Sequence, residues 1–492
     1  MGQEMGVYDW LSKPNTPPDS IEEDDLVCIH EASMYLLEEV GIQVTHPRAR
    51  EILETHGGAV DEDDIVTVPR ELVEQCLDRT PSQFTLHARN PDNDVVVGGD
   101  GPIVRTPGYG STTVLTFEDG RRPSTIEDYE TLLKLAQTED VITCAGYELC
   151  QPTDVDRTDR HLEMLVRSLT LTDLPVMGPT GPSPSVEACF DLVGVAMDDP
   201  ALEKPYVSGL VNTVPPRSTD EHMLEALLTY AEYGQPPIVS SFTMAGASGP
   251  ATLAGTIAQA NAETLLGITL VQLVNPGAPV VYGLPCSPVD TRYGSLAIGN
   301  PETGLFATYA ARLGRLYEVP SRAGGGLTDA KTVDYQAGSE SALVGAITEW
   351  SGVDFVLHSV GILESYATIS PEKFVLDCDV LRYLDRLHNG VSVDTEHLAL
   401  DLIGAVDPAE HFLDHPRTES STESEIHRPV VFDKRSHGEW ADRGGISAFE
   451  LAHERVRNRL ANYERPPIDS AIERELNNVL DDHRREIGRP SR

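Results

Sequence analysis

The feature that most constrains the fold is a repeating pattern of short apolar runs and longer amphipathic segments between residues 141 and 363. Each run leads into a loop rich in Gly, Pro or Ser, which is followed by a helical pattern. This alternation predicts parallel strands covered by helices, because a parallel connection needs a crossover of a dozen or more residues. The runs lie at 141–149, 175–179, 205–211, 237–246, 279–285, 319–326 and 353–363.

Two architectures share this alternation, the doubly wound open sheet and the closed (β/α)8 barrel. The chain has no G-x-G-x-x-G motif after an early strand, and its apolar runs are uniformly short. We therefore predict an α/β fold, a (β/α)8 TIM barrel with an N-terminal helical extension and C-terminal helices. The eighth strand is expected from the 101–117 region or from beyond residue 390.

The pattern divides the chain into three predicted parts. Residues 1–100 form a helical cap with a short β segment, 101–385 form the barrel, and 386–492 form a helical extension. The polar stretch 416–428 is predicted to be a surface loop or a linker, and the last part of the chain to be two charged amphipathic helices separated at Pro466-Pro467. Because helices of this kind wrap a surface or support a dimer, we expect a homo-oligomer.

The net charge of the chain limits the classes of partner that it can bind. The chain has 79 Asp and Glu against 37 Lys and Arg, a formal net charge of -42. Nucleic acids and anionic membranes would be repelled by such a surface, so neither is expected as a partner. The acidity is spread along the chain, which has few lysines, and this suits a salty cytoplasm, since at about 1 M salt the Debye length falls to about 3 Å. An ordinary acidic cytosolic protein poor in Lys is the alternative.

Location follows from the cysteines and the apolar content. The seven cysteines are widely spaced and include no C-x-x-C pair, which argues against a disulfide scaffold or a zinc ribbon. The N-terminus lacks the basic start and apolar run of a signal peptide, and no stretch of eighteen uninterrupted apolar residues occurs. We expect a soluble cytoplasmic protein.

Familiar catalytic signatures are missing. The sequence contains no H-E-x-x-H, G-x-S-x-G or G-x-x-x-x-G-K-[ST] motif, so zincin, nucleophile-elbow hydrolase and P-loop functions lack support. The run Gly324-Gly325-Gly326 at a strand end is compatible with a phosphate cradle, but a tight turn or a close ligand approach explains it better. In a barrel, functional groups are expected where strands end and loops begin.

Several long motifs in a fixed order carry a family resemblance. They are ASGPATLAGTIAQANAETLLGITLVQLVNPGAPVVYG (247–283), GGGLTDAKTVDYQAGSES (324–341) and GILESYATISPEKFVLDCDVL (361–381). The similarity continues upstream at 118–137 and downstream at 427–440. Over nearly the whole chain from about residue 25, the sequence resembles the trimethylamine methyltransferase family.

The resemblance implies a (β/α)8 barrel that transfers a methyl group from an amine to the cobalt of a separate corrinoid protein. Trimethylamine enzymes of this family carry pyrrolysine near the segment that here reads TDAKTVDYQAG, at or close to Lys331, Thr332 or Val333, and all residues here are ordinary ones. The pyrrolysine-free branch includes glycine betaine methyltransferases, so a quaternary amine is the implied substrate. Since the D-x-H-x-x-G motif of cobalamin-binding domains is absent, cobalamin is expected on a partner corrinoid protein, with no cofactor or metal on this chain.

A quaternary cation is held best by aromatic faces, with carboxylates nearby. The candidate aromatic faces are Tyr109, Tyr293 and Tyr335, each of which would also fit a packed rim position. The candidate carboxylates are Asp290 and Glu302 for binding and Glu364 and Asp329 for catalysis. The third catalytic candidate, His358, lies in an apolar run and would equally fit a hydrogen-bonded core position.

A betaine substrate adds a carboxylate, which needs a cationic or hydrogen-bonding anchor when it is buried. Arg322 and Arg292 are the candidate clamp, and Gln336 is a candidate donor. A choline-like or carnitine-like substrate would need a different second anchor. The alternatives are therefore a methyltransferase for trimethylamine or another methylated amine, and a non-catalytic barrel that binds a quaternary amine.

Overall fold

A curved sheet of seven parallel strands forms the centre of the protein. A computed structural model describes residues 21–486. The strand order is β6-β17-β16-β13-β11-β10-β9, and every neighbouring pair is parallel. The strands are β6 (Val104–Arg105), β9 (Val176–Gly178), β10 (Val207–Asn212), β11 (Pro237–Ser240), β13 (Val281–Gly283), β16 (Ser321–Gly324) and β17 (Phe355–Leu357). Six of the apolar runs predicted as strands therefore contain one, and the 101–117 region supplies β6.

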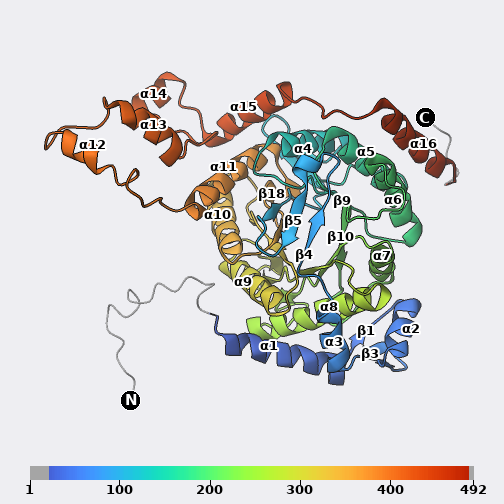
Figure 1. The fold of residues 1–492 in the computed structure, drawn as a ribbon. Coiled ribbons are helices and arrows are strands. Elements are labelled where there is room, and N and C mark those ends of the chain that lie inside the picture. The colour runs from blue at the N-terminus through green and yellow to red at the C-terminus, as the bar shows by residue number, and fades with distance from the viewer. Residues whose placement is uncertain (1–20, 487–492) are drawn as a thin grey trace, which may run out of the picture.

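Helices surround the sheet (Figure 1). They are α4 (Ile126–Thr138), α5 (Arg160–Leu171), α6 (Ser183–Met197), α7 (Glu221–Glu232), α8 (Leu253–Val274), α9 (Pro301–Leu316), α10 (Tyr335–Trp350) and α11 (Pro371–His388). Several begin with a side-chain cap: the side chains of Thr125, Asp220, Asp334 and Ser370 each accept a backbone N–H of the first turn. The predicted α/β architecture is confirmed.

The two edge strands of the sheet, β6 and β9, are bridged by residues 143–146. The N–H groups of Thr143 and Cys144 donate to the carbonyl of Arg105 at 3.1 and 3.2 Å. On the other side, Ala145 N donates to Pro175 O at 2.9 Å, and Met177 N donates to the carbonyl of Gly146 at 3.1 Å. The run 141–149 was predicted as a strand, but it has no regular strand geometry.

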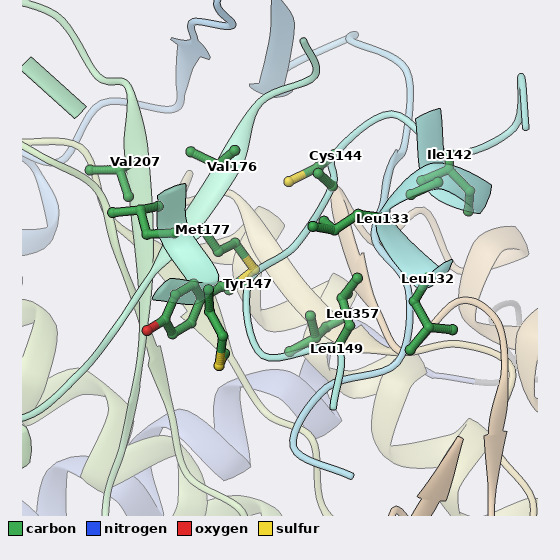
Figure 2. Close-up of a cluster of buried hydrophobic side chains, with 14 of the residues drawn as sticks. Leu132, Leu133, Ile142, Cys144, Tyr147, Leu149, Val176, Met177, Val207 and Leu357 are labelled. Carbon is green, nitrogen blue, oxygen red and sulfur yellow. The ribbon is translucent and has the colours of Figure 1, made fainter. Parts of the chain in front are cut away.

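The core of the described chain consists of two large clusters of buried apolar side chains and two small ones. Figure 2 shows part of the larger cluster, which includes Leu133 of α4, Cys144, Val176 of β9 and Leu357 of β17. The second cluster is centred on α8. This helix is long and apolar enough to cross a membrane by composition, but 89% of its apolar window is buried inside the protein. It has the burial of a core helix in a soluble protein.

A hairpin of β4 (Gln83–Leu86) and β5 (Val95–Gly98) covers the amino-terminal ends of the strands. His87 N donates to the carbonyl of Pro205, two residues before β10, at 2.9 Å. Gly98 approaches Pro320, which precedes β16, so closely that a Cβ at this position would lie 2.7 Å from the proline ring. The hairpin is seen in front of the sheet in Figure 1. The carboxyl ends of the strands therefore lie on the opposite side.

The N-terminal part packs against α8. It consists of α1 (Glu23–Tyr35), a π-helical turn (Leu36–Val40), α2 (Pro47–Thr55), α3 (Arg70–Leu77) and a small sheet of β1 (Ile42–Gln43), β2 (Ala59–Val60) and β3 (Ile65–Thr67). Ser33 links α1 to α8, since its hydroxyl donates to Ala258 O at 3.0 Å and accepts from Asn261 Nδ2 at 2.9 Å. Helices are present in the N-terminal part, as predicted, but the small sheet of β1, β2 and β3 was not predicted.

The C-terminal part contains five helices: α12 (Leu400–Ala405), α13 (Pro416–Glu425), α14 (His437–Asp442), α15 (Ala448–Ala461) and α16 (Ser470–Glu486). The two predicted charged helices are α15 and α16, which pack on the chain's own α11, α4, α5 and α6. The loop predicted at 416–428 is wrong, because Pro416 occupies the first turn of α13 and the His415 imidazole accepts from Arg417 N. Helices α12–α14 extend away from the body of the protein (Figure 1).

Candidate functional site

Two small sheets form the rim at the carboxyl ends of the central strands. The first has the order β18-β19-β7-β8 and the second β12-β14-β15. Their strands are β7 (Thr113–Thr116), β8 (Gly120–Pro123), β12 (Met244–Ala245), β14 (Ser287–Asp290), β15 (Ser295–Leu296), β18 (Ile362–Leu363) and β19 (Thr368–Ile369). They follow β6, β11, β13 and β17 in the chain, so the rim is built from the loops where a barrel-type fold places its functional groups.

Arg322 of β16 is the most unusual charge in this region. Its neighbour Ala323 packs into the apolar layer around α8, so strand alternation turns Arg322 to the other face of the sheet. The residue is only 3% exposed. Within residues 21–486, its side chain has no ion pair or hydrogen bond, and Nε is a buried donor without a partner. Burial lowers the pKa of Arg322 to about 10, so the guanidinium is still charged at neutral pH.

His358 and Tyr109 adjoin Arg322. The backbone N–H of Tyr109 donates to His358 Nδ1 at 3.1 Å, and the two rings meet edge to face with centroids 6.4 Å apart. Burial, reinforced by the nearby Arg322 charge, lowers the pKa of His358 well below its ordinary value. The imidazole is therefore neutral at physiological pH, with its proton on Nε2 because Nδ1 accepts a hydrogen bond.

Two aromatic residues complete the cluster and were missed by sequence reasoning. Tyr366 lies with its ring 4.6 Å from that of His358, and Phe242 packs edge to face on Tyr366 at 5.9 Å. Both follow a central strand, Phe242 by two residues and Tyr366 by nine. The position of Phe242 just after a strand was a usable signal, whereas Tyr366 lies too far beyond its strand for the same rule to apply.

Glu148 brings a half-buried carboxyl group close to Tyr109. Its backbone carbonyl accepts from Gly110 N at 2.6 Å. Burial raises the pKa of Glu148, while Gln151 and Arg160 act in the opposite direction. Glu148 also contributes to raising the pKa of the Tyr109 hydroxyl, after burial itself. The site thus holds one acidic group in addition to the arginine.

Asp329 and Glu364, predicted as catalytic, make contacts within the rim. Asp329 accepts hydrogen bonds from Ile298 N, Gly299 N and the Ser365 hydroxyl at 3.0, 2.9 and 2.6 Å. Glu364 Oε2 accepts from Thr368 Oγ1 at 2.6 Å and Arg121 Nε at 2.7 Å. Although burial opposes the effect, these two donors hold the pKa of Glu364 below its ordinary value. The Glu364 carboxylate is therefore an ionised acceptor at neutral pH.

The other predicted binding residues lie apart from the Arg322 cluster. Tyr293 and Tyr335 are 79% and 90% exposed. Arg292, itself exposed, pairs with Asp290 at 2.6 Å and stacks against Tyr293 at 5.5 Å. Gln336, in the first turn of α10, donates from Nε2 to Glu340 Oε1 at 2.8 Å.

Glu302, in the first turn of α9, has a buried carboxylate oxygen without a hydrogen-bond partner in the described chain. Of the predicted residues, the structure brings together Tyr109, Arg322 and His358.

One group of side chains could hold a metal ion by distance alone. In residues 21–486 it comprises Glu349, Asp385 and His388, on α10 and α11. Both carboxylates already bind the guanidinium of Arg105, at 2.8 and 2.6 Å. This group is therefore occupied by an arginine and does not belong to the Arg322 cluster.

The cluster suits a small ligand with two opposite charges. A buried, unpaired guanidinium favours an anionic group, especially a carboxylate that can accept two parallel hydrogen bonds. Aromatic faces beside it favour a cation that carries methyl groups rather than N–H donors. The neutral His358 adds an N–H donor without adding charge. These side chains could thus bind a ligand with a carboxylate at one end and a cationic group at the other.

Comparison with known proteins also points to enzymes that act on methylated amines. The profile described as trimethylamine methyltransferase matches residues 3–488. The chain is 40% identical to a glycine betaine methyltransferase of Desulfitobacterium hafniense (strain Y51), over 99% of this chain and 100% of that protein. It is 32% identical to a proline betaine:corrinoid methyltransferase of Eubacterium limosum (93% and 96% covered), and 30% identical to a trimethylamine methyltransferase of Methanosarcina barkeri (93% and 94%).

A solved structure is similar in fold. The crystal structure of the monomethylamine methyltransferase of Methanosarcina barkeri superimposes with a TM-score of 0.50 and covers 90% of this chain and 95% of that one. The two sequences are 12% identical in the aligned part, so this similarity concerns the architecture alone.

Proposed function

This chain belongs to the trimethylamine methyltransferase family, and on that premise we propose that it takes a methyl group from a betaine and delivers it to a corrinoid carried by a separate protein. The observation that carries the proposal is Arg322, a buried guanidinium with no partner among the described residues, beside the rings of His358, Tyr109 and Tyr366. A substrate with a carboxylate and a methylated nitrogen satisfies both features of the site.

Arg322 selects among the methylated amines. Trimethylamine and choline have no carboxylate, so neither would compensate the buried guanidinium. Glycine betaine and proline betaine each have a carboxylate close to a quaternary nitrogen, and proteins named for these two substrates are among the relatives of this chain. We propose a betaine of this size as the substrate, with Arg322 binding its carboxylate.

The aromatic side chains of the cluster bind the quaternary-ammonium end of the substrate in this proposal. We propose that Tyr109, Tyr366 and Phe242 face the quaternary nitrogen, where each cation–π contact contributes about 0.5–2 kcal/mol. Glu148, near Tyr109, balances the positive charge at longer range. In this arrangement His358 lies between the two ends, with Nε2–H available to the carboxylate.

The chemistry needs no general acid. A quaternary nitrogen already carries the charge that makes a neutral tertiary amine a good leaving group, so the chain has to strip water from the cation and orient one methyl group. The corrinoid supplies the nucleophile that accepts this methyl group. The neutral state of His358 fits the absence of proton transfer.

The test uses the purified chain with cob(I)alamin as a free methyl acceptor. Glycine betaine, proline betaine, carnitine, choline and trimethylamine are supplied in turn, and methylcobalamin is followed by its absorbance together with the demethylated amine by mass spectrometry. We expect product with glycine betaine or proline betaine and none with choline or trimethylamine. No transfer from any of the five compounds would overturn the proposal.

We further propose that the exposed Tyr293 and Tyr335 contact the corrinoid protein, since exposed aromatic residues often act as anchors in protein interfaces. Replacing Tyr335 by Ala is expected to slow methyl transfer to the corrinoid protein about tenfold and to leave the Kd for glycine betaine unchanged, because the residue lies outside the Arg322 cluster. Calorimetry and stopped-flow absorbance separate the two effects. An increase in Kd equal to the loss in rate would assign Tyr335 to the substrate instead.

For the architecture, we propose that residues 143–146 serve as the eighth wall segment of a closed barrel. The four backbone hydrogen bonds to β6 and β9 support this assignment.

The seven free cysteines fit a reducing compartment, and we propose the cytoplasm as the location.

The extended segment around α12 supports a homo-oligomer. Its exposed apolar side chains are Val391, Val393, Leu398, Leu400, Ile403 and Leu413. Exposed apolar side chains that gather in one segment of a chain are typical of an interaction site. We expect light scattering to give a mass above that of the 53.6 kDa monomer, and Leu400→Asp with Leu413→Asp to return it to the monomer. Leu316→Asp, on the exposed end of α9, is the control; a monomeric wild type contradicts the prediction.

We also propose adaptation to high salt, from the net charge of -42. Screening weakens repulsion between exposed carboxylates, so the melting temperature should rise between about 0.1 M and about 2 M KCl. Sucrose of equal osmolality controls for changes in water activity. A melting temperature that is constant or lower in KCl would identify an ordinary acidic protein.

A further inference from the structure

Three consecutive residues after β18 have a left-handed backbone. Glu364, Ser365 and Tyr366 have φ values of 53°, 53° and 76°, and none of them is a glycine. Each residue in this region costs of order 1–2 kcal/mol relative to its favoured conformation. Such a turn persists only where the surrounding structure holds it, so its anchors can be identified from its contacts.

The loop after β16 provides these anchors. Glu364 N donates to Ala330 O at 2.8 Å, and Ser365 N donates to Thr328 O at 3.2 Å. The Ser365 hydroxyl donates to Asp329 Oδ1 at 2.6 Å, which is the shortest of the three contacts. The turn is thus fastened to residues 328–330 by two backbone bonds and one charge-assisted side-chain bond.

Asp329 is itself held from two other sides. Its carboxylate accepts the N–H groups of Ile298 and Gly299, which precede α9. Its backbone N–H donates to Glu340 Oε2 of α10 at 2.9 Å. The Asp329 carboxylate therefore ties the turn to the segment before α9, and the Asp329 backbone ties it to Glu340 of α10.

The turn ends at Tyr366, whose ring packs on His358 and Phe242. Ser111 fixes the other side of this residue, because its hydroxyl donates to Tyr366 O at 2.8 Å. We propose that Asp329 and Ser365 are positioning residues, which hold the left-handed turn so that the Tyr366 ring faces the quaternary nitrogen. This inference rests on the proposed function for the role of Tyr366, but the fastening of the turn is independent of it.

The binding test compares Ser365→Ala with the wild type by calorimetry with glycine betaine. We expect a Kd about tenfold higher, because the ring samples orientations that lose the cation–π contact. Ser295→Ala, the same change at an exposed serine of the neighbouring hairpin, should bind like the wild type. In a double-mutant cycle, Asp329→Ala with Ser365→Ala should bind no more weakly than Asp329→Ala alone, since the two act through one hydrogen bond. Additive losses, or an unchanged Kd for Ser365→Ala in a folded protein, would overturn the proposal.

Hydrogen–deuterium exchange tests the turn without any ligand. We expect the amides of residues 364–367 to exchange at least about fivefold faster in both single variants, with the peptides of α8 unchanged as a sign of intact folding. Unaltered exchange at the turn refutes the positioning role. A wild type that binds no betaine refutes the proposed function instead, while the exchange result still decides whether Asp329 and Ser365 hold the turn.

Discussion

Replacing Arg322 by Met should weaken the binding of glycine betaine by at least about 100-fold. The loss follows because the substrate carboxylate would enter a buried site without its counter-charge, and breaking a buried charge pair costs about 2–5 kcal/mol. Arg322→Lys should recover only part of the affinity, since a lysine cannot form two parallel hydrogen bonds to a carboxylate. Isothermal titration calorimetry measures the Kd of each variant.

The melting temperature of the Arg322→Met protein provides a second test of the role of Arg322. Because the guanidinium is buried without a partner in the described structure, an apolar side chain of similar length should keep or raise the melting temperature. Arg292→Met, at an exposed arginine paired with Asp290, is the matched control and should leave the Kd within twofold. A Kd for Arg322→Met within about threefold of the wild type would remove the arginine from the substrate site.

Arg105→Ala should lower the free energy of unfolding by about 3–5 kcal/mol. The guanidinium donates to both oxygens of Glu349, at 2.9 and 2.8 Å, and to both oxygens of Asp385, at 3.0 and 2.6 Å. The Glu349 side chain is buried, and burial raises its pKa while Arg105 opposes that change. Without Arg105, an uncompensated carboxyl group would remain between α10 and α11.

Urea titration followed by circular dichroism measures this loss. Arg105→Met combined with Glu349→Met should recover most of the stability, because apolar groups of similar volume can replace a buried pair. The exposed pair of Arg485 and Asp482 is the control, and Arg485→Ala should change the free energy of unfolding by less than about 1 kcal/mol. A loss below about 1 kcal/mol for Arg105→Ala would show that Glu349 finds another partner or becomes hydrated.

The candidate site was only partly predictable. Arg322 and His358 were found because both lie in or directly after an apolar run, where the strand order alone places them at one end of the sheet. Tyr293 and Tyr335 were chosen by the same rule from longer loops, and they are strongly exposed. A strand fixes the direction of its side chains by alternation, whereas a loop does not, so the rule loses its force a few residues beyond the strand.

Tyr366 illustrates what such a rule cannot reach. Its ring points to His358 only because three residues adopt a left-handed backbone, which their side chains disfavour. No local pattern predicts this turn, since its anchors are Thr328, Asp329 and Ala330, more than thirty residues earlier in the chain.

The amino-acid sequence by itself determined the parallel α/β architecture, through the period of its apolar residues, and the family, through long motifs in a fixed order. The division into three parts at residues 100 and 385 stays a prediction. Only the tertiary structure decided that Arg322 is buried without a partner, that Tyr366 and Phe242 join His358, and that α15 and α16 pack on their own chain. The physical reason is that the spacing of apolar residues indicates which face of a helix or strand is buried. Charge pairing and ring contacts instead depend on residues that are far apart in the sequence and come together only in the folded protein.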